Sequence, residues 1–569
     1  MGSFRAVSLC AVVLLQVAVA HASTGGLGAH ILPRAPSDSI NIPIHTIQSR
    51  SPADNTTFGA SLSSLSLTSD KQSYFTIITV GGLNFRVDLD TGSADLWLAS
   101  SACQTNTCKN VPLYPLNHQS SSFAELNGNK TAFKAQYADT TFASGFVARE
   151  TIGLSTSNLT LANQAFGVVT DSNVSLTDQA SGIMGLGFPR LSSISSAVAN
   201  ASSFFATLTA QGLLEYPLFA FSLTRNSSGT LTLGAIDSSI VTNTSNIGWN
   251  KVAQFPPFGP GNNVSSYLQW AIPISGIAVN GTQFTPTSTY ASIGLTRSLA
   301  LFDIGSPGIY GPYQDVSRIF AMIDGARLVD AVGGQWALPC DTTVPMSFTF
   351  GQRNYSISPT DYIIGSASGN PNLCLSWPLA LPPNSDGIDW QIGSAFLRTV
   401  YSVFSYGING KEPPLIGLYP LQNNTNTTET QLASFLSANS ATVTTTLPNF
   451  ILSTPTFTTP PYTLNTSVSV SVGGIVSSGL ANSTYSALFA QKTTLTNTSA
   501  LPTISPSPTV VTIVVTDSAG DVSTTVSFAS KAAVTLGLPS SSKSSSFPLG
   551  MVLIPFITFV RIMLFAWTC

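Results

Sequence analysis

Charged residues are scarce in this 569-residue chain, at 8% of the total, and histidine is scarcer still, with four residues. A serine or cysteine hydrolase needs a partnered imidazole, and a zinc hydrolase usually takes two or three. Only His118 lies in the region that we expect to form the folded body, and its polar neighbours favour a loop position. The sequence therefore argues against triad and zinc chemistry, and it predicts no metal site and no cofactor.

Basic runs are also absent, since 22 Lys and Arg against 25 Asp and Glu leave a net charge of −3. This balance argues against a nucleic-acid partner. The glycines of Gly182–Gly187 do not have the spacing of a dinucleotide-binding loop, and no acidic residue is placed to hold a ribose. Of only six cysteines, Cys10 lies near the start and Cys569 at the end. The remaining four are enough for two disulfides in an oxidising compartment.

Apolar stretches long enough to interact with a membrane are confined to the two ends of the chain. Residues 1–22 carry one basic residue, Arg5, then an apolar core and small residues, which is typical of a signal peptide cleaved after Ala20 or Ala22. The alternative is a buried N-terminal helix. Residues 23–70 contain several prolines and no regular periodicity, so they are predicted to be a pro-segment or linker.

The body of the chain, residues 71–422, is rich in Val, Ile, Thr, Tyr and Phe in short runs split by Gly, Pro, Asn and Ser. This pattern predicts an all-β fold, with Phe75–Val80 as one strand and a short helix near Ser203–Gln211. About 350 residues exceed one comfortable hydrophobic core, so we expect two lobes. The predicted lobes are 71–249 and 250–422.

One local pattern occurs twice in the body. The apolar run Phe85–Leu89 leads into Asp90 and a glycine turn, and Ser298–Phe302 leads into Asp303 and another. Either one alone would be unremarkable, because Asp-Thr-Gly is common as a plain turn. Each copy is followed at similar distance by a short stretch closed by glycine, Ile183–Gly185 and Gln391–Gly393. The chain is therefore predicted to be internally duplicated, with one aspartate in each half.

Two carboxylates at a shared axis cannot both ionise cheaply, so the pair holds one proton over an acid range. In that state one member can take a proton from water while the other donates one to a carbonyl oxygen. Peptide hydrolysis needs both actions. On these motifs the chain resembles the pepsin family of aspartic proteases over roughly Lys71 to Gln422.

The resemblance implies a bilobal fold with a cleft between the lobes, and it assigns roles residue by residue. The implied catalytic pair is Asp90 and Asp303. The residues implied to support the pair are Thr91, Gly92, Ser93, Gly305 and Ser306. The implied substrate-binding flap carries Tyr137, Ala138 and Asp139, with Trp97 behind it. The implied disulfides join Cys103 to Cys108 and Cys340 to Cys374.

Four positions depart from the family pattern. Ile304 stands where a Thr or Ser hydroxyl would link the two turns, and Ala138 stands where a glycine usually follows the flap tyrosine. Ser181 and Ser394 replace residues that are commonly acidic. These departures leave open a second function, a catalytically weakened surface protein of protease fold that acts in binding or adhesion.

Residues 423–546 are dominated by Thr, Ser, Pro, Ala and Asn, which is typical of a glycosylated stalk. The strand-like run Thr509–Val515 favours the alternative of a small β-domain. About fifteen Asn-x-Ser/Thr acceptors run through body and stalk, including Asn158, Asn226, Asn354, Asn465 and Asn497.

The last stretch, 547–569, is apolar except for Arg561, and the small residues Ser540–Ser542 and a short polar spacer precede it. This order is typical of a glycosylphosphatidylinositol attachment signal. A transmembrane helix is the alternative, although Arg561 would interrupt it. The tail, acceptors and stalk resemble the anchored aspartic proteases of fungi. We therefore expect a monomeric, secreted or surface-tethered endopeptidase that cleaves polypeptides at acid pH.

Overall fold

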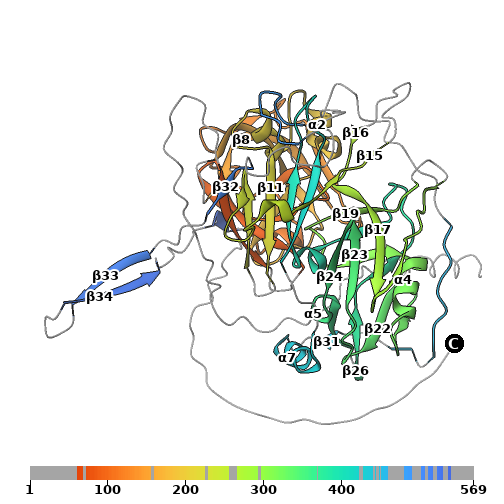
Figure 1. The fold of residues 1–569 in the computed structure, drawn as a ribbon. Helices are drawn as coiled ribbons and strands as arrows, with labels where there is room; N and C mark the ends of the chain where they lie inside the picture. The colour runs from red at the N-terminus through yellow and green to blue at the C-terminus, as the bar shows by residue number, and fades with distance from the viewer. Residues whose placement is uncertain are drawn as a thin grey trace, which may run out of the picture.

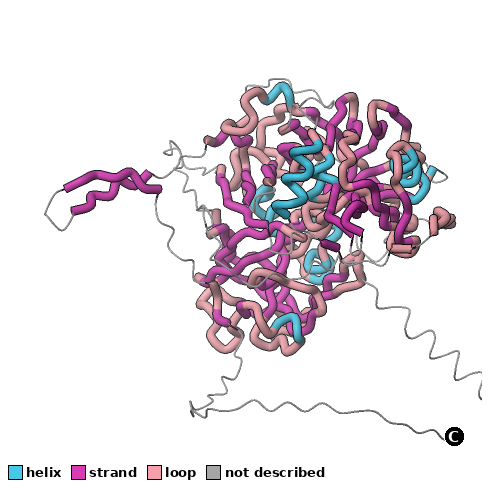
Figure 2. The backbone as a smooth tube through the Cα atoms, turned by 90° about the horizontal axis from the view of Figure 1, so that it is seen from below, coloured by secondary structure: helices cyan, strands magenta, loops and turns pink. Residues whose placement is uncertain are grey.

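The computed structural model describes 60–67, 72–155, 159–224, 228–255, 266–291, 296–367 and 370–421, and beyond these 427–439, 442–443, 447–448, 450–458, 480–489, 501–505, 510–516, 522–528 and 536–539. Strands dominate these residues and the helices are short (Figure 1, Figure 2). Figure 1 shows the first half of the chain, red to yellow, beside the second half, green. The predicted signal peptide, most of 23–70 and the tail 547–569 lie outside the described residues.

The largest sheet has 14 strands and takes in both ends of the body. Its strands are β1 (Ser61–Leu67), β2 (Tyr74–Val80), β3 (Leu83–Asp90), β4 (Leu96–Ala99), β6 (Ala124–Glu125), β7 (Ala132–Gln136), β8 (Phe142–Leu154), β9 (Thr160–Ser172), β10 (Ala180–Gly185), β11 (Leu218–Leu223), β12 (Ser228–Leu233), β14 (Gly248–Lys251), β29 (Val400–Ser405) and β30 (Leu415–Pro420). Because β29 pairs with β11 and β30 with β14, the end of the second half closes onto the first.

The second lobe contains two further sheets. The first has eight strands: β17 (Ala271–Val279), β18 (Thr282–Phe284), β19 (Leu299–Phe302), β20 (Ile309–Pro312), β23 (Met346–Phe350), β24 (Arg353–Ile357), β27 (Leu379–Leu381) and β28 (Trp390–Ile392). The other has five: β21 (Arg327–Asp330), β22 (Gln335–Pro339), β25 (Ile363–Ala367), β26 (Asn370–Ser376) and β31 (Thr442–Val443). The predicted all-β class with two lobes is confirmed.

Helices and small ladders complete the described fold. The α-helices are α2 (Ser193–Ala197), α3 (Phe204–Ala210), α4 (Tyr313–Ala321), α5 (Pro359–Tyr362), α6 (Ser394–Leu397) and α7 (Glu429–Asn439), and the 3₁₀ helices are η1 (Asn106–Cys108), η2 (Pro189–Leu191) and η3 (Thr244–Asn246). The two-stranded ladders are β13 (Ile236–Asp237) with β32 (Thr503–Ile504), β15 (Gln254–Phe255) with β16 (Ser266–Tyr267), β33 (Val510–Thr516) with β34 (Val522–Phe528), and β5 (Pro112–Leu113) with β35 (Leu538–Pro539). The helix expected near Ser203–Gln211 is α3.

The two halves repeat one arrangement of strands. In the first half β10 pairs in parallel with β3 and antiparallel with β4. In the second half β28 pairs in parallel with β19 and antiparallel with β20. In each half, the strand that ends in an aspartate turn thus lies beside the strand that carries the short stretch ending in glycine. The internal duplication predicted from the sequence is confirmed.

Buried aromatic residues join the two halves behind these turns. Trp270, from the second half, lies 4.3 Å from Phe188 between ring centroids, and its indole N–H donates to the carbonyl of Leu186 at 2.9 Å. The hydroxyl of Tyr406 donates to the carbonyl of Gly187 at 2.8 Å. Such aromatic pairs add about 0.5–1.5 kcal/mol each beyond the area that they bury. The segment that flanks the first aspartate is therefore fixed by residues of the other half.

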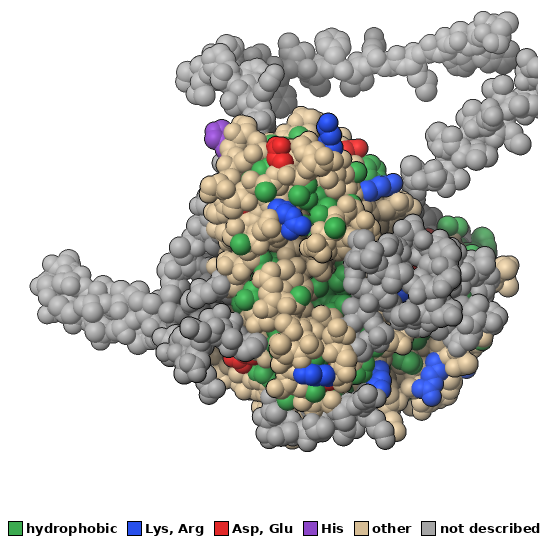
Figure 3. Space-filling model, turned by 90° about the horizontal axis from the view of Figure 1, so that it is seen from above, with side chains coloured by type: hydrophobic (Ala, Val, Ile, Leu, Met, Phe, Trp, Pro, Cys, Tyr) green, Lys and Arg blue, Asp and Glu red, His purple; other side chains and the backbone are tan. Residues whose placement is uncertain are grey.

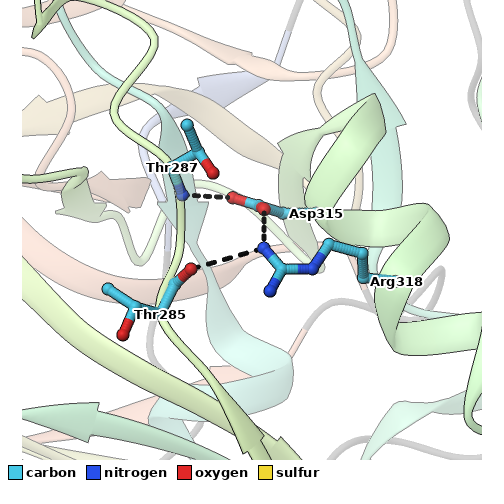
Figure 4. A network of polar contacts seen from close by, with 4 residues as sticks. All are labelled: Thr285, Thr287, Asp315 and Arg318. Carbon is cyan, nitrogen blue, oxygen red and sulfur yellow. Dashed lines mark hydrogen bonds and ion pairs between the residues drawn. The ribbon is translucent and has the colours of Figure 1, made fainter.

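An ion pair between a buried aspartate and a half-exposed arginine holds α4 to the second lobe (Figure 4). Asp315 is fully buried and accepts hydrogen bonds from the backbone N–H of Thr287 at 3.1 Å and from Arg318 at 3.2 Å. Arg318 also donates to the carbonyl of Thr285 at 3.3 Å. Because every donor comes from α4 or from the segment after β18, the pair fixes the helix against that segment.

The folded body begins earlier than the sequence suggested. We predicted that residues 23–70 precede it, yet β1 lies inside the 14-stranded sheet, between β12 and β2. Leu65 is fully buried, and the hydroxyls of Ser63 and Thr76 hydrogen-bond at 2.9 Å. The sequence pattern did not indicate this strand, because its three leucines do not alternate regularly and serine occupies the other positions.

Described segments of the predicted stalk pack on the lobes instead of standing in solvent. Ala481, Tyr485 and Phe489 are buried in a cluster with side chains from the 14-stranded sheet. The ring of Phe489 lies 4.7 Å from that of Trp249, edge to face. These three residues and the cluster around them are called the C-terminal seal below. The stalk interpretation is therefore wrong for 480–489.

A buried carboxyl group anchors the C-terminal seal. Glu412, 1% exposed, accepts hydrogen bonds from the backbone N–H of Phe489 at 2.7 Å and from the hydroxyl of Tyr216. Lys411 donates to the carbonyl of Tyr485 at 3.0 Å. The seal is thus held by polar contacts as well as by apolar burial.

Other parts of the same region also contact the lobes. β32 pairs in parallel with β13, β31 pairs with β25, and Leu432 of α7 is buried in the main core. The ring of Phe457 lies 4.7 Å from that of Tyr313 on α4. The strand-like run that favoured a β-domain forms β33, which pairs with β34 as a hairpin projecting from the lobes (Figure 1).

The described surface carries few charges. On the face seen in Figure 3, the acidic and basic side chains are scattered rather than gathered into one patch. Within the described part of the chain, no helix is long and apolar enough to cross a membrane.

Candidate active site

The two aspartates lie where two buried strands end in glycine turns. β3 delivers Asp90 and β19 delivers Asp303, and the two side chains are 8% and 5% exposed. A β-carbon on Gly305 would lie 2.7 Å from Oδ1 of Asp90, and one on Gly92 would lie 3.1 Å from Cγ of Asp303. Only glycine lets the turns approach this closely, so the structure brings the predicted pair together.

One threonine links the two turns. The hydroxyl of Thr91 donates to the carbonyl of Phe302 at 2.8 Å and accepts from the N–H of Ile304 at 3.0 Å. Ile304 offers no hydroxyl for the reciprocal link, and its side chain is fully buried in the main core. Thr91 is thus the hydroxyl that joins the two turns, and position 304 has no hydroxyl to match it.

Backbone and serine donors surround both carboxyl groups. The N–H of Gly92 lies 2.8 Å from Oδ1 of Asp90 and 3.2 Å from Oδ1 of Asp303. Ser93 donates to Oδ2 of Asp90 at 2.5 Å. On the other side, Ser306 donates to Oδ2 of Asp303 at 2.7 Å, and the N–H of Gly305 donates to Oδ1 at 2.9 Å. All five supporting residues predicted from the sequence therefore lie at the pair.

Burial and mutual repulsion perturb the pair. Burial first, and the negative charge of Asp303 second, raise the pKa of Asp90 well above its usual range. Hydrogen bonds from Ser93 and Gly92 oppose this rise in pKa but do not cancel it. A carboxyl group that stays protonated beside an ionised neighbour can act as a general acid.

Tyr137 follows β7 in the hairpin that β7 forms with β8. The indole N–H of Trp97 donates to the Tyr137 hydroxyl at 2.7 Å, and the negative charge of Asp90 helps burial to raise the pKa of Tyr137. Ala138 and Asp139 are exposed at the tip. The left-handed backbone of this turn falls on Thr140, with φ of 71°, so alanine at position 138 needs no unusual conformation. This turn therefore does not need a glycine at position 138.

The sequence prediction missed Gln391. Its side-chain N–H donates to Oδ2 of Asp303 at 2.7 Å and to the hydroxyl of Ser306 at 2.5 Å. The internal duplication offered a signal for this residue. The position that matches Gln391 in the first half is Ile183, so one copy has an apolar residue where the other has an amide.

Both disulfides implied by the family resemblance are present, Cys103 with Cys108 and Cys340 with Cys374. Of the other departures, Ser181 is buried near the start of β10, and the hydroxyl of Ser394 donates to the carbonyl of Pro307 at 3.1 Å. Among the described residues, no group of three or more His, Cys, Asp or Glu is placed to hold a metal.

Two β lobes with paired aspartate turns at their junction define the class of bilobal aspartic proteases. Residues 73–410 match the eukaryotic aspartyl protease family, and the chain belongs to it. An aspartic protease of Phaffia rhodozyma is 32% identical over 336 residues, which cover 58% of this chain and 73% of that protein. Mouse cathepsin E is 30% identical over 349 residues, covering 59% and 78%. Major aspartyl peptidase 1 of Cryptococcus neoformans is 27% identical over 339 residues, covering 57% and 64%. The protein is an aspartic-type endopeptidase.

Proposed function

We propose that this endopeptidase hydrolyses peptide bonds at acid pH, with Asp90 and Asp303 as a joint general acid and base. The observation that carries the proposal is the single N–H of Gly92, which lies within hydrogen-bonding distance of both carboxyl groups. Two carboxyl groups held so closely share one proton over an acid range.

The proposed reaction uses water as the nucleophile. The ionised aspartate takes a proton from the water while its oxygen attacks the peptide carbonyl carbon, and the protonated aspartate donates its proton to the carbonyl oxygen. The resulting diol collapses when one of its hydroxyls gives a proton to the ionised aspartate and the protonated aspartate gives its proton to the peptide nitrogen, which leaves as the amine. No covalent enzyme intermediate and no metal is needed.

The proposed substrate is an extended polypeptide bound between the lobes, beneath the hairpin that carries Tyr137. The bond from Trp97 supports this role, because it fixes the phenol hydroxyl beside the turn of Asp90. We expect apolar side chains on either side of the scissile bond, as in the family that the sequence resembles.

We further propose that the protein is a monomer that enters the secretory pathway through residues 1–22 and is tethered through 547–569, as in anchored fungal members of the family. The two disulfides, the Asn-x-Ser/Thr acceptors and the apolar tail support this location. The boundary between lobes near Trp249 and a pro-segment within 23–60 belong to the same proposal.

The test is cleavage of a mixed peptide library at about pH 3–6 by the processed full chain, with and without pepstatin. Wild-type protein should cut, and Asp90→Asn and Asp303→Asn should each lose at least about 100-fold in kcat/KM. Ser181→Ala, which alters a buried hydroxyl outside the dyad, is the matched control and should retain activity.

Folded, processed protein that cuts nothing would contradict the proposal. The absence of a linking hydroxyl at Ile304 would then favour the second candidate function, a surface protein of protease fold that binds without cleaving.

A further inference from the structure

The two carboxyl groups of the dyad have unequal surroundings. Asp303 accepts four hydrogen bonds, from the N–H groups of Gly305 and Gly92 and from the side chains of Ser306 and Gln391. Asp90 accepts two in the described structure, from Gly92 and Ser93. Since donors to a carboxylate stabilise its ionised form, this difference favours the negative charge on Asp303.

Gln391 is the residue that makes the difference. Ser93 and Ser306 are equivalent donors to the outer oxygens of their own aspartates, at 2.5 and 2.7 Å. The counterpart of Gln391 in the first half is Ile183, whose side chain lies in an apolar cluster with Trp97 and donates nothing. The duplication thus supplies an internal control for the amide.

We propose that Gln391 is a positioning residue that makes Asp303 the ionised member of the dyad and leaves the shared proton on Asp90. The inference rests on the proposed function. Asp303 then takes the proton from water as the water oxygen bonds to the peptide carbon, and Asp90 gives its proton to the carbonyl oxygen. The products of this step are a neutral diol, a protonated Asp303 and an ionised Asp90.

The pH profile of kcat/KM separates this assignment from its reverse, because its two limbs report the two proton losses of the free enzyme. If Asp303 ionises first, it is charged both before and after the second loss. Removing the Gln391 donor then raises only the pKa of the acid limb. If Asp90 ionises first, the same change raises only the pKa of the alkaline limb.

The experiment measures kcat/KM from about pH 2 to 8 for the wild-type full chain and Gln391→Ile, with a peptide free of ionisable side chains near the cut. Isoleucine copies the residue at the matching position of the first half. We expect the midpoint of the acid limb to rise by about one pH unit, with the alkaline limb unchanged.

Three more variants complete the design. Gln391→Met keeps the length of the side chain without a donor or a charge and should also raise the acid limb, which covers the case in which Gln391→Ile does not fold. Ser306→Ala should raise the same limb, because Ser306 donates to Asp303. Ser93→Ala should raise the alkaline limb instead, because Ser93 donates to Asp90.

Two results would overturn the inference. Movement of the alkaline limb alone in both Gln391 variants would place the proton on Asp303. Unchanged limbs in both would show that the amide does not act on the dyad. Failure of the proposed function is a separate outcome. In that case the wild-type protein shows no acid cleavage, or shows cleavage that Asp90→Asn does not abolish.

Discussion

The hydroxyl of Thr91 connects the two turns that carry the dyad. This hydroxyl is fully buried and serves both turns, as a donor to Phe302 and as an acceptor from Ile304. Because Ile304 cannot return the link, no second hydroxyl compensates for a change at Thr91. The link between the two turns therefore depends on one hydroxyl, whereas a symmetric site would have two.

Replacing Thr91 with Val keeps the shape of the side chain and leaves a buried carbonyl and a buried N–H without this partner. We expect the free energy of unfolding to fall by about 2–4 kcal/mol, together with a loss of kcat, because each buried group loses a hydrogen bond. Chemical denaturation and kcat at the optimum pH measure the two effects. The control is Thr209→Val, a fully buried threonine whose hydroxyl donates to one local carbonyl, Ala206. A Thr91→Val protein no worse than this control would contradict the prediction.

At the residue scale, the sequence predicted the site residues whose role depends on their chemical type. It did not predict those whose role depends on the direction in which the side chain points. Asp90 and Asp303 could be found because each follows an apolar strand and precedes a glycine. Gln391 could not be assigned a role, because a strand residue points to either face and only the folded register decides which. The consequence of Ile304 was also partly hidden, since burial in the main core gives that side chain a packing role.

Among the elements, the hairpin of β7 and β8 stores backbone strain at its tip. Thr140, exposed and β-branched, adopts a left-handed backbone conformation with φ of 71°. The turn is closed by hydrogen bonds from Thr140 N–H to the carbonyl of Tyr137 at 3.0 Å and from Tyr137 N–H to the carbonyl of Thr141 at 2.9 Å. The strain persists because these bonds fix the loop around Tyr137.

Thr140→Asn should relieve that strain, because asparagine adopts the left-handed conformation more readily than a β-branched residue. We expect the free energy of unfolding to rise by about 1 kcal/mol, seen as a higher Tm. The matched change is Lys134→Asn at an exposed position of β7, where asparagine brings no such gain. Equal or lower stability of Thr140→Asn relative to the Lys134 variant would mean that the hydroxyl or methyl of Thr140 contributes more than the strain costs.

The elements that the sequence missed share one physical cause. β1 and segment 480–489 are rich in serine, threonine and small residues, and each is stabilised by partners far away in the chain. β1 lies against β12, about 165 residues later, and Phe489 lies against Trp249 and Glu412. Composition and periodicity describe only neighbours along the chain, so they indicated a linker and a stalk. Contacts over such separations decide otherwise.

For the whole molecule, buried carboxyl groups make the free energy of unfolding depend on pH. Burial is the main cause that raises the pKa of Asp95, Asp315, Asp389 and Glu412 above their usual values. A carboxyl group whose folded pKa is raised contributes stability that is complete below its unfolded pKa, about 4, and is lost as the pH rises through the folded value. Glu150 acts in the opposite direction: burial acts to raise its pKa, but hydrogen bonds from donors including Ser120 and Ser122 outweigh burial and lower the pKa. The balance favours stability in acid.

We therefore expect the Tm of the full chain to be higher near pH 4 than near pH 7. Glu412→Gln, which cannot ionise, should reduce that difference, because it removes one of the groups responsible. Scanning calorimetry at both pH values measures it. Glu125→Gln, at an exposed position of β6, is the comparison and should leave the difference as it is in the wild type. A Tm that rises toward neutral pH would contradict the expectation.

The C-terminal seal limits where a tethered form of this enzyme could be cut free. A protease that cuts at 421–479, just after the last strand of the body, would release a molecule that lacks Ala481, Tyr485 and Phe489. Glu412 would lose the N–H of Phe489, and Trp249 would lose the ring that covers it. β35, which ends at Pro539, also pairs with β5 of the first lobe, so a cut between β32 and β35 would remove that contact as well. Release that keeps every described contact with the lobes requires a cut beyond Pro539.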